Sequence, residues 1–240
     1  MTQEAETHGS LRIDRERLPP KLAEYVQTIE KLLKKPLPEH FTAFYSMRDG
    51  LTYSASRGGS SLGVDATLCG LEAMFDGFKK HVQLRNEEAF DDFQGGDMYD
   101  APFCGTVWSE DFSLDEKGAL TRLNTMLRSK LLVSVPGAPD ALVVDFAPKT
   151  KKGVAKEYEI LLVSSGNDVA PLDLDFPTFV RHFERFGATG WYYAFVGAKS
   201  ARVLNIDLAA TVKNGMSVFG PDLAQEIDAL VTRAGSGSGR

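Results

Sequence analysis

The densest group of side chains that could do chemistry is an acidic stretch at residues 87–116. It holds ten carboxylates and no lysine or arginine. Because the whole chain carries a net charge of −6, subtracting these ten negative charges leaves the rest of the chain at +4. Aromatic side chains are interleaved with the carboxylates. Such a stretch suits a surface that meets a basic protein, since carboxylates steer the approach and buried aromatic side chains anchor a complex.

The residues that we predict to contact such a partner combine these two side-chain types. They are Glu87, Glu88, Asp91, Asp92, Asp97, Tyr99, Asp100, Trp108, Glu110 and Asp111. The alternative interpretation is a solvated acidic loop whose aromatic side chains point into the core.

Carboxylates can also bind calcium or cleave glycosidic bonds. Asp97 and Asp100 lie beside an oxygen-rich Gln-Gly-Gly sequence, but the regular aspartate spacing of a calcium loop is absent. Glycoside hydrolysis needs two carboxyl groups at a set separation, which a sequence does not give. We therefore predict no metal site, no cofactor and no catalytic residues.

Other reactive residue types form no pattern typical of a site. The glycine-rich residues 57–61 lack the Gly-Lys-Ser/Thr ending of a phosphate-binding loop and predict a turn. Cys69 and Cys104 are isolated from each other, and we expect both to be buried as small apolar side chains. A basic patch at 149–156 predicts a solvated hairpin tip or a contact with an acidic partner. The four histidines are widely spaced: His8, His40, His81 and His182.

Composition narrows the classes of partner. The chain has 240 residues, of which 43% are apolar and 25% charged, as in ordinary globular proteins. Its net negative charge disfavours a general affinity for nucleic acid or anionic membranes. No apolar run approaches the roughly 18 residues that span a bilayer, and the N-terminus lacks the pattern of a secretory signal. We expect a cytoplasmic protein.

Hydrophobic periodicity predicts the elements that must position these residues. Apolar side chains at three- and four-residue steps predict helices at 21–35, 38–48, 71–82, 114–127, 175–186, 208–219 and 223–230. β-Rich runs predict strands at 51–55, 131–135, 141–146 and 158–164, with 107–112 as a strand or turn. This order predicts an α+β fold, a mixed or antiparallel sheet with helices packed on it and a C-terminal helical extension.

The same patterns suggest one domain between flexible ends. We expect a flexible N-terminus at 1–19, an α+β core at 20–187, a C-terminal helical extension of the same domain at 188–234, and a flexible tail at 235–240. The aromatic stripe on the helix at 175–186 is interpreted as core packing.

Three segments in order resemble the SUKH superfamily. The first is Leu-Pro-Glu-His-Phe from residue 37, followed by Phe44-Tyr45 and Asp49-Gly50. The second is residues 131–146, LLVSVPGAPDALVVDF, which is similar to a strand, a polar turn and a strand ending in aspartate, here Asp145. The third is residues 169–183, with Phe176 and Phe179 at two aromatic positions and Asp175 in place of the usual serine.

The resemblance implies a function as well as an α+β fold. It implies an immunity-type protein-binding module of a polymorphic toxin system, which neutralises a co-encoded bacterial toxin. Together with the acidic stretch at 87–116, it leads us to expect a toxin with a basic surface, for example a nuclease, whose active site the module occludes. The resemblance implies no enzyme activity. The alternatives are an intracellular scaffold or regulatory protein of the same fold and a hydrolase that uses paired carboxylates.

Overall fold

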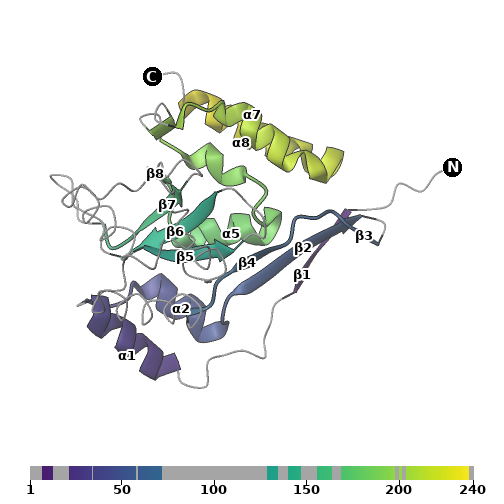
Figure 1. Ribbon diagram of the computed structural model, residues 1–240. Coiled ribbons are helices and arrows are strands. Elements are labelled where there is room, and N and C mark those ends of the chain that lie inside the picture. Colours follow the sequence, from purple (N-terminus) through teal and green to yellow (C-terminus); the bar gives the residue numbers. More distant parts are fainter. Residues whose placement is uncertain are drawn as a thin grey trace, which may run out of the picture.

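The computed structural model describes residues 7–12, 22–33, 35–57, 59–71, 129–134, 140–146, 156–163, 169–197, 200–201 and 204–237. Within these residues the chain forms one antiparallel sheet in the order β1-β2-β4-β5-β6-β7-β8, with β3 paired to β2 (Figure 1). The strands are β1 Thr7–Arg12, β2 Leu51–Arg57, β3 Ser60–Ser61, β4 Ala66–Leu68, β5 Ser129–Ser134, β6 Ala141–Asp145, β7 Glu159–Val163 and β8 Val169–Pro171.

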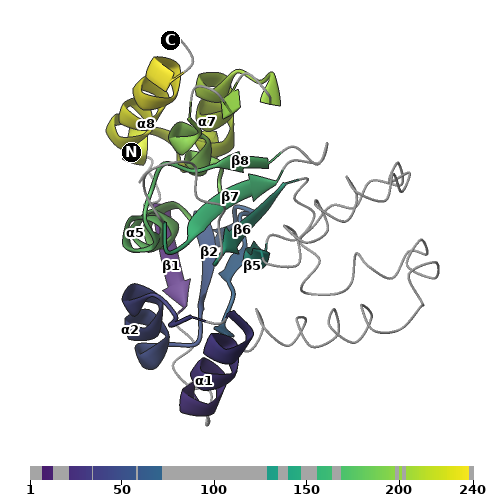
Figure 2. The ribbon, with the colours of Figure 1, turned by 90° about the vertical axis from the view of Figure 1, so that its left-hand side faces the viewer.

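Helices pack on this sheet and beyond its β8 edge. Figure 2 shows α2 and α5 on the same side of the sheet and the C-terminal helices beside β8. The helices are α1 Leu22–Leu33, α2 Glu39–Met47, α5 Phe176–Phe186, the 3-10 helix η3 Trp191–Phe195, α7 Leu208–Met216, the 3-10 helix η4 Ser217–Leu223 and α8 Ala224–Gly237. The predicted α+β class with a C-terminal helical extension is confirmed. No helix among the described residues is long and apolar enough to cross a membrane.

The ends of the chain differ from the sequence-based expectation. Residues 7–12 were expected to be flexible, but they pair with β2 from Thr7 opposite Arg57 to Arg12 opposite Thr52. The tail predicted from residue 235 onward is helical as far as Gly237. The first segment is ordered by backbone hydrogen bonds to β2, and the second continues helix α8. Local composition reveals neither interaction. The expected helix at 71–82 beyond Leu71, the helix at 114–127 and the segment 107–112 lie outside the described residues.

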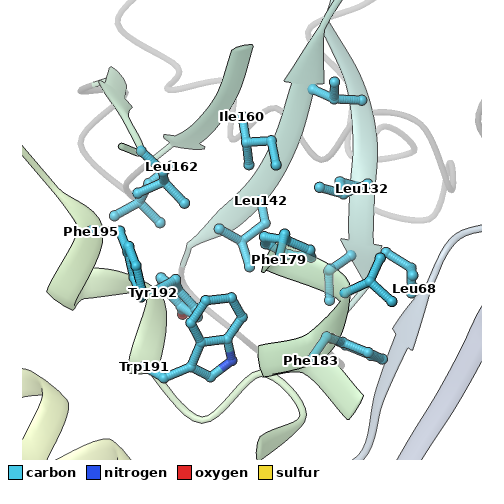
Figure 3. Close-up of a cluster of buried hydrophobic side chains, with 14 of the residues drawn as sticks. Leu68, Leu132, Leu142, Ile160, Leu162, Phe179, Phe183, Trp191, Tyr192 and Phe195 are labelled. Atoms are coloured by element: carbon cyan, nitrogen blue, oxygen red, sulfur yellow. The ribbon is translucent and has the colours of Figure 1, made fainter. Parts of the chain in front are cut away.

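The core lies between the sheet and α5 with η3. Figure 3 shows Leu142, Ile160 and Leu162 on the strands, near Phe179 on α5 and Phe195 on η3. The predicted aromatic stripe of α5 is buried throughout and is confirmed as core packing; its members are Phe176, Phe179, Val180, Phe183 and Phe186. Such aromatic side chains bury the largest areas in a core.

A tight backbone junction follows α2. Gly50 has a φ of 90°, a conformation that side-chain-bearing residues rarely adopt. A Cβ at this position would lie 2.3 Å from the carbonyl oxygen of Leu68 on β4. Beside it, the Asp49 carboxylate accepts a hydrogen bond of 3.1 Å from the backbone N–H of Leu71. The Asp-Gly pair therefore fixes the start of β2 against the end of β4.

We predict that Gly50→Ala destabilises the protein by about 2 kcal/mol or more, because it combines backbone strain with a steric clash. Gly59→Ala is the matched control, since Gly59 has a similar φ of 81° and a Cβ there would meet no atom within 4 Å. Chemical denaturation measures both free energies of unfolding. Equal losses in the two variants would contradict the proposed clash.

Candidate functional site

The predicted partner-binding residues all lie outside the described residues. They are Glu87, Glu88, Asp91, Asp92, Asp97, Tyr99, Asp100, Trp108, Glu110 and Asp111. Cys104, His81 and most of the basic patch also lie outside them. The acidic surface therefore stays a prediction.

Among the described residues, a groove of about 600 Å³ lies between α2 and α5. We call it the α2–α5 groove. Its lining comes from residues along α2, from the first two turns of α5 and from Glu184. The lining residues are Glu39, His40, Ala43, Phe44, Met47, Arg48, Phe176, Pro177, Val180 and Glu184. The sequence carries no signal for this groove, because its lining residues follow ordinary helical patterns.

The middle of the groove is apolar. Phe44, Phe176 and Val180 are largely buried lining residues that belong to the core. Met47 is 63% exposed, which makes it the most exposed of the large hydrophobic side chains that the structure describes. Methionine is flexible and polarizable, and it is common on surfaces that adapt to protein partners. This arrangement can accept apolar side chains from another protein.

Charged groups border the apolar part. The guanidinium of Arg48 donates a hydrogen bond of 2.9 Å to the Glu184 carboxylate and lies 5.4 Å from the centre of the Phe44 ring. Glu39 and His40 are exposed lining residues from the first turn of α2. The groove therefore presents an ion pair and further polar side chains around an apolar centre, as protein-binding surfaces commonly do.

The N-terminus of α5 is held by two side chains. The Asp175 carboxylate accepts a hydrogen bond of 2.8 Å from the backbone N–H of Thr178, and the Tyr158 hydroxyl accepts one of 2.8 Å from that of Phe176. The hydrogen bonds from Thr178 lower the pKa of Asp175. Burial raises the pKa of Tyr158. Both contacts fix the start of α5, and with it the position of Phe176 and Pro177 in the groove.

The three segments of the SUKH resemblance meet directly below this groove. The Phe41 ring of the first segment stacks on Phe176 of the third, with centroids 3.9 Å apart and an interplanar angle of 16°. Phe146 of the second segment contacts the same Phe41 ring edge-on at 5.1 Å. Asp145, the aspartate of the second segment, ends β6 and is 3% exposed.

Cys69, His182 and most of the predicted turn at 57–61 lie within the described residues. Cys69 is buried, as predicted, and its carbonyl accepts a hydrogen bond of 2.8 Å from the Tyr45 hydroxyl. The predicted turn at 57–61 includes the end of β2 and the whole of β3, Ser60–Ser61, which pairs with β2. His182 is half-buried on α5. No group of three or more metal-ligating side chains occurs in the described part of the chain.

Compared with protein-family models, curated proteins and solved structures, the chain gives no match. The SUKH resemblance therefore stays a prediction that depends on the three segments.

We predict that Asp175→Ala costs about 1 kcal/mol of stability at neutral pH, because the helix loses its N-cap acceptor. Asp175→Ser is the matched control and should lie within a few tenths of wild type, roughly, since serine caps helices equally well. Because the pKa of Asp175 is lowered in the folded protein, its charged carboxylate adds to stability at pH values above the ordinary aspartate pKa. This added stability is lost as the pH falls through the folded-state pKa of Asp175. Thermal unfolding at neutral and acidic pH checks both points. A serine variant as unstable as the alanine variant would contradict the capping role.

Proposed function

We propose that this protein is an immunity-type protein-binding module that neutralises a co-encoded bacterial toxin by occluding its active site. The observation that carries the proposal is the convergence of the three SUKH-like segments in one aromatic core. Phe41, Phe146 and Phe176 come from these three segments, and the ring of Phe41 contacts the other two. Three weak sequence patterns that specify one packed unit support the resemblance more strongly than any of them does alone.

The antiparallel sheet with helices on it agrees with the fold that the resemblance implies, but a fold hosts many functions. Surface residues must therefore determine which partner the protein binds. The acidic stretch at 87–116 supplies the charge that a toxin with a basic substrate groove would recognise. Complementary charge raises the association rate of a complex, and buried apolar contacts slow its dissociation.

In this proposal the α2–α5 groove supplies the apolar contact. Met47 would meet an apolar side chain of the toxin, and the nearby Arg48–Glu184 pair would lie at the edge of the interface. Steric occlusion requires only that the module cover the toxin's active site with a rigid surface. The proposed mechanism therefore assigns no catalytic step to this chain.

Reversing the charge of Asp91, Asp92, Asp97 and Asp100 to lysine should weaken toxin binding by about tenfold or more, mainly by slowing association at low salt. The measurement is surface plasmon resonance against the product of the neighbouring toxin gene, at two salt concentrations. The matched control reverses four exposed acids elsewhere: Asp65, Glu157, Asp173 and Asp228. A folded quadruple variant that binds like wild type, or a control variant that binds as weakly, would remove the acidic surface from the proposal.

Met47→Glu should lower toxin affinity by about tenfold, because it places a carboxylate in an apolar contact, while stability stays within roughly 0.5 kcal/mol of wild type. Val169→Glu is the matched control, since Val169 is an exposed apolar residue at the β8 edge, 44% accessible. The same binding assay and a denaturation curve check both variants. Unchanged affinity of the Met47 variant would exclude the α2–α5 groove from the interface.

The alternative is an intracellular scaffold or regulator of the same fold. The two functions differ in a growth assay, in which the neighbouring toxin gene is expressed with or without this protein. Rescue of growth supports the immunity proposal. Continued killing in the presence of well-expressed, folded protein contradicts it and favours the regulator.

A further inference from the structure

His182 lies in an aromatic cluster between α5 and η3. Its ring is half-buried, and its centroid lies 4.9 Å from that of Trp191, at an interplanar angle of 29°. Phe195 and Phe186 lie 5.2 Å and 5.9 Å away, measured in the same way. The buried side of the imidazole therefore faces aromatic rings, which hydrate a positive charge poorly.

Helix α8 covers the same cluster. The Arg233 guanidinium on α8 lies 4.4 Å from the centre of the Phe195 ring, and its Nε donates a hydrogen bond of 3.2 Å to the Ala194 carbonyl. Glu226 on α8 accepts two hydrogen bonds, of 2.7 Å and 3.2 Å, from Arg185 on α5. These contacts attach α8 to η3 and to α5, the two elements between which His182 lies.

The charges facing His182 oppose its protonation. Burial is the largest cause that lowers its pKa, followed by the positive charges of Arg181 on α5 and Arg233 on α8. Glu226 acts in the opposite direction, but its effect is the smallest of the four. This carboxylate is already bound by Arg185. Among the described residues, Arg233 forms an ion pair of 3.8 Å with the exposed Asp173.

We propose that protonation of His182 releases α8 from η3, so that the C-terminal helix is a pH-sensitive cover over the aromatic cluster. Stacking on the Trp191 indole favours an imidazolium. That contact joins α5 to η3, so it persists when α8 leaves and does not oppose the release. When α8 leaves, the positive charge of Arg233 no longer opposes protonation of the imidazole, and the smaller, opposite effect of Glu226 leaves with it.

The direction of the pH effect follows from the difference in the His182 pKa between the docked and released states of α8. With α8 docked, the Arg233 charge is one of the causes that lower the pKa of His182. In the proposed released state this cause is absent, so the pKa lies closer to its ordinary value. The neutral imidazole therefore favours docking, and this contribution is fully present above the ordinary histidine pKa. It is lost as pH falls toward the docked-state pKa. Acidification uncovers the η3 aromatic side chains.

Hydrogen exchange of the full chain tests this proposal. After correction for intrinsic exchange, the α8 amides of wild type should exchange several-fold faster at about pH 5 than at about pH 7.5. The increase is at most about tenfold for each unit by which the His182 pKa differs between the docked and released states. In His182→Phe the aromatic contacts remain and the pH dependence should vanish. His40→Phe is the matched control, because His40 is exposed on α2, and it should keep the wild-type dependence.

Retained pH dependence in the His182 variant, its loss in the His40 variant, or pH-independent exchange of α8 in wild type would overturn the proposal. An NMR titration of the wild-type imidazole gives a readout that does not depend on whether a variant folds. A His182 pKa below the ordinary value of about 6.5 supports the proposal, and a value at or above it overturns the proposal.

Discussion

The stack of Phe41 on Phe176 is the contact on which the rest of the structure depends. It joins α2, near the start of the described chain, to α5, which follows the last strand of the sheet. Phe146 and Tyr158 surround the same Phe41 ring edge-on, at 5.1 Å and 4.9 Å, and bring the ends of the central strands into the cluster. Because aromatic pairs have preferred geometries and bury large areas, this cluster fixes both the distance and the orientation of the two helices.

The α2–α5 groove is a consequence of that stack. The large rings of Phe41 and Phe176 hold α2 and α5 apart. Where smaller side chains line the space instead, here Ala43 and Pro177, a hollow remains between the helices. Met47 is the last residue of α2, shortly before the Asp49-Gly50 junction with β4, and its side chain is exposed. A rigid, partly apolar hollow next to an ion pair is the kind of surface that the proposed binding function requires.

The C-terminal helices are attached by a different set of interactions. Arg57 on β2 donates a hydrogen bond of 2.9 Å to the Phe219 carbonyl, and Arg185 and Arg233 provide the contacts to α8. These arginines are about half-exposed, so each ion pair contributes little and the buried apolar side chains of α7 and α8 provide most of the stability.

The sequence by itself determined the elements whose side chains repeat with a clear period. The stripe from Phe176 to Phe186 predicts α5 and its buried face, and the apolar runs at 141–146 and 158–164 predict β6 and β7. The sequence did not reveal β1, because Thr-His-Gly-Ser-Leu-Arg has little strand preference and is ordered by pairing with β2. Nor did it reveal the groove or the setting of His182. Met47 and His182 belong to ordinary helical patterns, and only the packing of α2, η3 and α8 against α5 decides that one is exposed in a hollow and the other lies among aromatic rings and guanidinium groups.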